Sequence, residues 1–163
     1  MEILEELKRE IIVILFAMLP IVELRGAIPL GISLGLSPIH STIISIIGNA
    51  TIVPFLLISL HPIMDYFEKT VLFSKTIGWV KSRSMKKAGT IKKYRILGLF
   101  LFVAIPIPTT GAWTASIIAS LLKIDLKQSI LTIWAGIIMA GLIVYSISYR
   151  LTPILRILDF QLT

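Results

Sequence analysis

Two charged residues near the N-terminus, Glu23 and Arg25, are the first candidates for chemistry because each lies between apolar runs. After Arg25 the next charged residue is Asp65. Ionisable groups inside a membrane are costly unless they are paired or hydrated, and they usually mark the path of an ion or a substrate. A carboxyl group at Glu23 could bind and release a proton, and a guanidinium at Arg25 suits bidentate contact with a phosphate or a carboxylate.

The spacing of this pair favours a turn over a helix. Side chains at i and i+2 do not share a helix face, whereas in a turn both can point into one cavity. Next to them, Gly26 can adopt a positive φ and lets backbone approach a ligand. Pro29 allows a second helical arm to begin just after the break. The plainer alternative is that Glu-Leu-Arg-Gly forms an interfacial loop after a short first helix.

A second string, Pro106-Ile-Pro-Thr-Thr-Gly-Ala-Trp113, has a similar break but no charge. Prolines at i and i+2 cannot lie inside a regular helix, because each lacks a donor and clashes with the preceding turn. Free N–H groups at the start of the next helix could bind an anion. The tryptophan could line the same cavity, or it could be an interfacial aromatic residue. The string supplies six candidate binding residues: Pro106, Pro108, Thr109, Thr110, Gly111 and Trp113.

The remaining polar residues give weaker signals. Asn49 falls within a long apolar run, where an amide more often joins helices than touches a substrate, and it stays a candidate binding residue. His40 and His61 each lie beside a proline, with no second ligand at metal spacing. The chain has no cysteine, no Gly-x-Ser-x-Gly string and no P-loop motif. We therefore expect no metal, no cofactor and no enzymatic activity.

The composition points to a membrane. The chain of 163 residues is 56% hydrophobic and 15% charged, with a mean hydropathy of +0.92. Soluble domains are about 45–50% apolar and about 25% charged. A chain this short cannot hide the excess in one core, so the excess must face lipid. Soluble enzymes, disordered tails and nucleic-acid modules are therefore poor interpretations.

The lengths of the apolar runs do not suit a plain bundle of spanning helices. Charge-free runs cover residues 26–64 (39 residues), 96–122 (27) and 128–149 (22), and a shorter one covers residues 11–22 (12). One straight span needs about 20 residues. The first of these runs is too long for one span and too short for two with a loop. Broken helices that enter and leave on the same side fit better, provided that protein or water covers the broken backbone.

The sequence therefore predicts an all-α integral membrane protein with two inverted repeats. Each repeat is a re-entrant helical hairpin plus one transmembrane helix, and a basic amphipathic cytoplasmic segment joins the two. Placing Gly26 on Gly111, an offset of 85 residues, aligns small residues in both arms, although chance could do the same. The single membrane domain, residues 1–163, has five predicted segments: a hairpin at 11–36, a transmembrane helix at 39–60, the linker at 65–95, a hairpin at 96–122 and a transmembrane helix at 128–149.

Basic residues predict the orientation. Nine lysines and arginines lie within residues 65–95, so this segment is expected in the cytoplasm and both termini outside the cell. The net charge of +7 belongs mainly to this linker. The linker could form an interfacial helix on anionic headgroups or a solvated basic loop. The acidic N-terminus does not resemble a signal peptide. The expected location is the cell membrane, with several passes.

The strings Glu23-Leu-Arg-Gly-Ala-Ile-Pro29 and Pro106-Ile-Pro-Thr-Thr-Gly-Ala-Trp113 resemble the putative small multidrug export protein family, which looks like a distant branch of the DedA superfamily with its VTT-domain lipid scramblases. The resemblance covers nearly the whole chain and implies oppositely directed re-entrant hairpins that meet in the membrane. It also implies functional roles for Glu23 and Arg25. DedA proteins typically carry arginines around the second proline motif, whereas this chain has none between Arg95 and Lys123.

These observations favour a membrane transporter or lipid translocase. A proton would bind at Glu23, and an anionic lipid or amphipathic small molecule would meet Arg25 between the hairpins. Membrane lipids, protons and a second copy of the chain are the expected partners, and nucleic acid is not. Two alternatives remain open. One is an intramembrane enzyme acting on lipid, with Glu23 and Thr109 or Thr110 in acid–base roles, and the other is a membrane scaffold that transports nothing.

Overall fold

The computed structural model is all-α over the residues that it describes, which are the backbone of 2–68, 88–107 and 110–162 and the side chains of 3–60, 62–63, 94–107 and 110–150. Six helices cover these residues, and no strand occurs among them. The helices are α1 (Glu2–Met18), α2 (Glu23–Ser33), α3 (Pro38–Glu68), α5 (Ala88–Ala104), α6 (Ala112–Leu121) and α7 (Leu126–Leu162). The predicted fold class is confirmed at this level.

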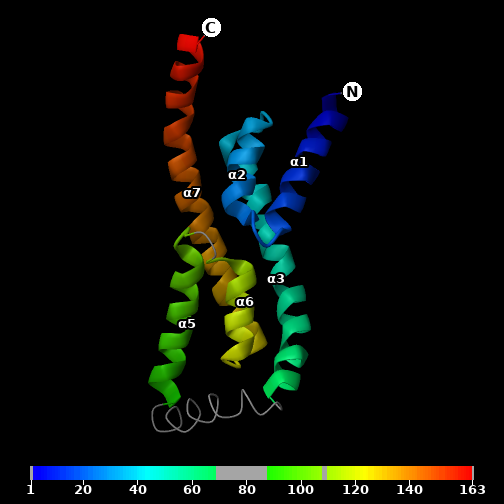
Figure 1. Cartoon of the computed structure of the whole chain (residues 1–163), viewed down its shortest axis with the longest axis vertical. Coiled ribbons are helices and arrows are strands. Elements are labelled where there is room, and N and C mark those ends of the chain that lie inside the picture. Colours follow the sequence, from blue (N-terminus) through cyan, green and yellow to red (C-terminus); the bar gives the residue numbers. More distant parts are fainter. Residues whose placement is uncertain (1, 69–87, 108–109, 163) are drawn as a thin grey trace.

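The two longest helices, α3 and α7, pack against each other, and the short helices α2 and α6 contact both of them (Figure 1). The other short helices lie outside this centre, α1 against α3 and α5 against α7. The α1–α2 pair occupies the half of the molecule that carries both termini, and the α5–α6 pair occupies the other half. The breaks within the two pairs, at residues 19–22 and at residues 105–107 and 110–111, lie near mid-length. Segments far apart in the sequence therefore meet in the middle of the molecule.

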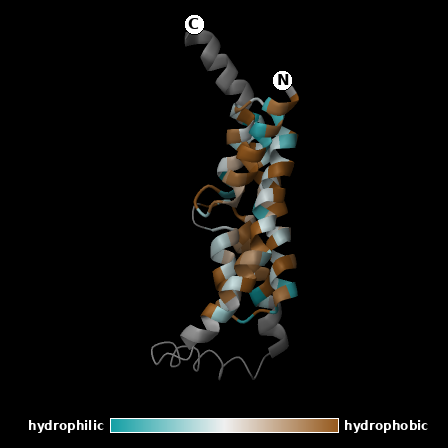
Figure 2. Ribbon diagram, turned by 90° about the vertical axis from the view of Figure 1, so that its right-hand side faces the viewer, coloured by the Kyte–Doolittle hydropathy of each residue, from teal (hydrophilic) through white to brown (hydrophobic). Residues whose placement is uncertain are grey.

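Parts of α3 and α7 are long and apolar enough to cross a membrane, over Pro38–Leu60 and Leu126–Arg150. Large apolar side chains are exposed along both, such as Ile47 and Phe55 on α3 and Leu142 on α7. Figure 2 shows hydrophobic residues over most of the length of the molecule. These features indicate a membrane protein. The helices extend beyond the predicted apolar segments, because a charged residue ends an apolar run without ending a helix.

Similar turns connect each short pair to the following long helix. Within residues 34–37, N–H groups of Leu34 and Leu36 bond to carbonyls four and five residues earlier, and the same bonds recur at Leu122 and Ile124. A residue with positive φ lies in each turn, Gly35 at 92° and Lys123 at 50°. This pattern of bonds ends helices without leaving their last carbonyls unpaired. The matching positions are 88 residues apart rather than the 85 that the sequence alignment used.

Close helix crossings recur at the same interval. A Cβ added at Gly48 on α3 would lie 2.8 Å from the Ile14 carbonyl oxygen and 3.1 Å from the Ala17 Cβ, both on α1. A Cβ at Gly136 on α7 would lie 3.1 Å from the Phe100 carbonyl oxygen and 2.6 Å from the Val103 Cβ, both on α5. Glycine thus lets the first helix of each pair approach the backbone of its long helix.

The proline within α3 has a partner on α7. Pro54 lacks an N–H, so the carbonyl of Ala50, four residues earlier, cannot make its usual helical bond. The indole N–H of Trp134 donates to this carbonyl at 3.0 Å. The bond ties α7 to α3 at a carbonyl that Pro54 leaves without its helical donor.

Candidate functional site

Glu23 lies at the start of α2, where the chain reverses direction after α1. Pro20 disfavours helix at the residue before it, so α1 ends at Met18, and Glu23 takes the left-handed conformation with φ of 49°. This conformation is uncommon outside glycine and turns the backbone into α2. The side chain is 6% exposed and points away from its own helix pair, toward α6.

The carboxylate of Glu23 caps the beginning of α6. The Trp113 N–H donates to its Oε1 at 3.4 Å, and the Ala112 N–H also faces the group. The positive end of the α6 dipole favours a negative charge at this place. A Cβ at Gly111 would overlap the carboxylate, so only glycine leaves room for it. The anion expected at the start of this helix is therefore the protein's own carboxylate.

Arg25 extends from α2 to the broken segment between α5 and α6. Its guanidinium donates to the carbonyls of Ile107 and Thr110, to the Thr110 Oγ1 at 3.2 Å and to the Ile105 carbonyl at 3.3 Å. A longer bond of 3.5 Å reaches the carbonyl of Val103 on α5. A guanidinium presents five donors in a planar fork, which suits several acceptors at once.

The acceptors are available because the segment cannot continue as a helix. Pro106 has no N–H, and the N–H of Ile107 bonds to the Ile105 carbonyl at 2.8 Å instead of reaching Val103. Carbonyls at the end of α5 are thereby left without helical donors. Arg25 supplies donors and places a positive charge at the negative end of the helix dipole.

The predicted site residues separate into four groups. Glu23, Arg25, Thr110, Gly111 and Trp113 come together, and the half-buried Pro106 lies in the same broken segment. Gly26 and Pro29 lie inside α2, so the expectation that Pro29 begins the second arm is wrong, because the reversal at Glu23 already starts the helix. Asn49 is buried on α3. Pro108 and Thr109 lie outside the described residues.

Backbone groups of the site were not identified from the sequence. The carbonyls of Val103, Ile105 and Ile107 and the carbonyl of Met18 all accept side-chain donors, the last from the Trp113 indole at 3.0 Å. The available signal was the proline pair, which frees carbonyls and so requires a donor. Within the described residues, no group of three His, Cys, Asp or Glu side chains could hold a metal ion.

Comparison with protein families gives one match. A family model described as "Putative small multi-drug export protein" matches residues 23–143, from Glu23 to the middle of α7. No curated protein and no solved structure matches the chain. The matched region contains both charged site residues and the whole broken segment after α5.

Proposed function

Because this chain belongs to the putative small multi-drug export protein family, we propose that it is a proton-coupled exporter of an amphipathic small molecule or an anionic lipid. The substrate passes between the α1–α2 pair and the α5–α6 pair. A proton binds at Glu23, and an acidic group of the substrate binds Arg25. The family's name supports transport over catalysis; the substrate class and the coupling to protons are our proposal.

Each short pair is proposed to be a re-entrant hairpin, and the two halves to be inverted repeats. Turns and glycine crossings recur 88 residues apart, which supports the repeat. With 11 and 10 residues, α2 and α6 are about 15 Å long, half the thickness of a hydrocarbon core of about 30 Å. In the proposed orientation, the domain lies in the cell membrane with residues 65–95 in the cytoplasm. The proposed partners are membrane lipids and a second copy of the chain.

The bridge between the two pairs is the observation that carries the proposal. Within the described residues, the buried Glu23 and the half-buried Arg25 of α2 bind backbone groups and one hydroxyl at the break of the other pair, so they hold the halves in one arrangement. A proton on Glu23 would remove the charge that caps α6. A substrate anion would replace the carbonyls that now accept from Arg25. Both ligands would therefore bind a second arrangement better than this one, which is the requirement for a ligand-driven change.

The second candidate, a scaffold without transport, is favoured by one aspect of the same contacts. Arg25 donates to backbone carbonyls in the way that a purely structural cap would. An intramembrane enzyme has less support. The Thr110 hydroxyl donates to the carbonyls of Ile105 and Ile107, at 3.0 and 2.9 Å, and these contacts do not activate a nucleophile.

Flux through reconstituted vesicles tests the proposal. Vesicles with an imposed pH gradient are supplied with a fluorescent anionic lipid, an amphipathic organic anion or an amphipathic organic cation. We expect gradient-dependent flux of an anionic probe, its loss in Arg25→Ala, and loss of the dependence on the gradient in Glu23→Gln. Asp125→Asn, which changes an exposed carboxylate outside the bridge, is the matched control. Flux that both bridge variants leave at the wild-type level would refute the proposed site, and no flux of any probe would favour the scaffold.

A further inference from the structure

Four polar residues follow one ridge of α3: Ser37, Ser41, Ser45 and Asn49. Residues spaced by four lie on a continuous row along a helix. The twelve steps from the first of these residues to the last cover about 18 Å, at 1.5 Å per step. Ser37 is exposed, whereas the other three are at most 1% exposed. The next residue of the row is the buried Val53, so the polar row ends there.

The inner part of the row lacks hydrogen-bond partners. The Ser41 Oγ donates to the Ile28 carbonyl of α2 at 2.8 Å. The Ser45 Oγ and the Asn49 Oδ1 have no partner within the described part of the chain. An unsatisfied buried polar atom costs about 1–3 kcal/mol. Native proteins usually satisfy such atoms with ordered water or an ion.

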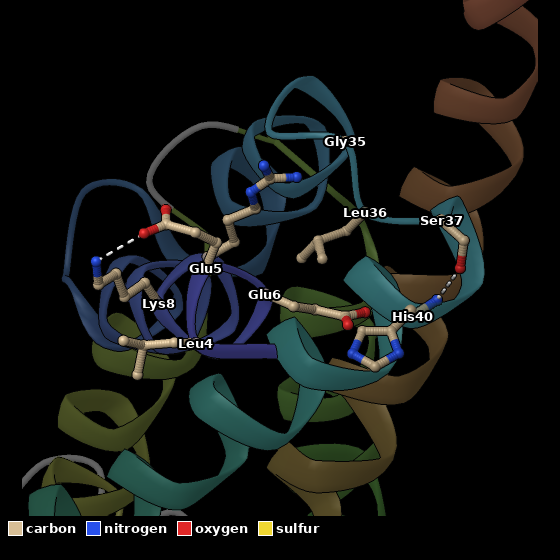
Figure 3. A pocket seen from close by; sticks show the side chains of 9 residues that line it. Leu4, Glu5, Glu6, Lys8, Gly35, Leu36, Ser37 and His40 are labelled. Carbon is tan, nitrogen blue, oxygen red and sulfur yellow. Dashed lines mark hydrogen bonds and ion pairs between the residues drawn. The ribbon is translucent and has the colours of Figure 1, made fainter. Parts of the chain in front are cut away.

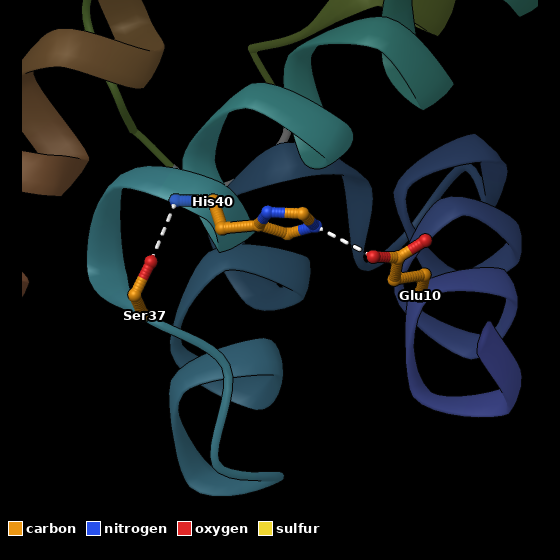
Figure 4. Close-up of polar contacts among 3 residues, drawn as sticks. All are labelled: Glu10, Ser37 and His40. Carbon is orange, nitrogen blue, oxygen red and sulfur yellow. Dashed lines mark hydrogen bonds and ion pairs between the residues drawn. The ribbon is translucent and has the colours of Figure 1, made fainter. Parts of the chain in front are cut away.

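The outer end of the row opens into a cavity of about 790 Å³ at the end of the molecule that carries the N-terminus (Figure 3). His40 on α3 and Ser37, just before the start of α3, line it. The charged groups around it are those of Glu5, Glu6, Lys8 and Arg9 on α1, and the His40 Nε2 lies 2.8 Å from the Oε1 of Glu10 (Figure 4). The Ser37 Oγ accepts from the His40 N–H at 3.3 Å and so caps the start of α3.

The inner end of the row reaches the level of Glu23. Ser41 packs against α2 at Ile28, and a Cβ at Gly31 would run into its hydroxyl. Because α2 and α3 run antiparallel, each turn forward along α3 matches one turn back along α2 (Figure 1). Ser45 therefore lies level with the first turn of α2, and Asn49 lies one turn further. Arg25 is the charged group beside Glu23 at this level.

We propose that water molecules enter the interface beside Ser45 and Asn49, and that these waters and the Ser41 hydroxyl conduct protons between the cavity and Glu23. The ligand of this site is water in its neutral and protonated forms. A proton arriving at the cavity passes along the row as O–H bonds form ahead of it and break behind it. It ends on a carboxylate oxygen of Glu23, and every serine hydroxyl regains the proton it gives. The use of this route by transported protons rests on the proposed function, whereas the presence of water along it does not.

Cysteine accessibility tests the route, because the chain has no cysteine of its own. Ser45→Cys and Asn49→Cys are compared with Val53→Cys, a buried position on the same row beyond its polar part. A small water-soluble methanethiosulfonate is added to protein in vesicles. We expect both test positions to react about tenfold faster than Val53→Cys or more, since only hydrated thiols ionise readily. Equal, slow reaction at all three positions would overturn the proposal.

A second pair of variants guards against loss of folding and separates the two proposals. Ser45→Thr keeps the hydroxyl and Ser45→Val removes it at similar volume. We expect gradient-driven flux to fall about tenfold in Ser45→Val alone, at matched stability. Unreactive cysteines, together with flux that depends on Glu23 but not on the Ser45 hydroxyl, would refute the water route. The proposed exporter function would still be supported. Reactive cysteines with flux indifferent to Glu23→Gln would support the hydrated row and refute the exporter's proton site.

Discussion

The two halves of the molecule use the same position for the same task but with different chemistry. Arg25 and Trp113, 88 residues apart, lie near the start of α2 and of α6. Arg25 donates to carbonyls at and beyond the end of α5, and the Trp113 indole donates to the Met18 carbonyl at the end of α1. Each pair thus caps the first helix of the other pair. One cap is a cation with several acceptors, and the other is a neutral group with a single donor.

The difference between the two breaks explains the difference between the caps. The first break is a turn of residues 19–22 with one proline, whereas the second runs over residues 105–111 and contains two. The second break therefore exposes more carbonyls and needs more donors. Glu23 and Gly111 are likewise 88 residues apart, and the glycine makes room for the carboxylate. Both charged residues at the contact between the two breaks thus come from α2, and the broken segment after α5 contributes backbone groups and a hydroxyl.

Removing the charged cap should have the largest effect. Arg25→Ala leaves several carbonyls without donors and Glu23 without its cationic neighbour. We therefore expect the free energy of unfolding to fall by about 3 kcal/mol. Thermal unfolding in detergent measures this change. Arg25→Lys should lose less, because an ammonium keeps the charge but cannot reach as many acceptors. Arg9→Ala, at the exposed N-terminal end, is the control. Equal stability of Arg25→Ala and Arg9→Ala would contradict the capping role.

Adding a methyl group at Gly111 should have the second-largest effect on the free energy of unfolding. Gly111→Ala forces the Glu23 carboxylate away from the start of α6, at a cost of about 2 kcal/mol. Gly98→Ala on α5 is the matched control, because an added Cβ there meets nothing within 4 Å. The double variant Gly111→Ala with Glu23→Ala should recover part of the lost stability. Additive losses in the double variant would show that the two residues do not compete for one space.

Neutralising Glu23 should cost less than removing its neighbour. Glu23→Gln keeps the shape but weakens the hydrogen bonds and the charge at the start of α6, and we expect a loss of about 1–2 kcal/mol. The same thermal assay reports it, together with the loss of gradient dependence in the flux assay. The control Asp125→Asn, at an exposed carboxylate outside the bridge, should leave the gradient dependence unchanged. Full gradient dependence in Glu23→Gln would count against proton binding there.

The neutral cap should give the smallest effect. Trp113→Phe removes one hydrogen bond, to the Met18 carbonyl, and should cost about 1 kcal/mol. Trp134→Phe removes a similar bond, to the Ala50 carbonyl, and provides the comparison. If Trp113→Phe destabilised the protein as much as Arg25→Ala, the proposed difference between the two caps would be wrong.

The sequence predicted the helical class and the broken segments, because prolines and apolar runs act locally. It also singled out Glu23 and Arg25, since charges between apolar runs are conspicuous. The inverted repeat stays a prediction: small residues align at an offset of 85 residues in the sequence, whereas the similar turns and glycine contacts lie 88 residues apart. The sequence could not identify carbonyl acceptors such as that of Ile105, because every residue has one. It also misjudged Pro29, because the reversal at Glu23 depends on backbone conformation rather than on composition.

The distance between the two breaks, measured by pulsed electron resonance, tests the central claim most directly. Nitroxides on Leu19→Cys and Ile107→Cys, both exposed positions in a chain without other cysteines, report the separation of the halves. If Glu23 and Arg25 hold the halves together until a proton binds, neutral pH gives one short population and acidic pH adds a longer one. Glu23→Gln should then show the longer population at both pH values. A single unchanged distance under all of these conditions would contradict the account.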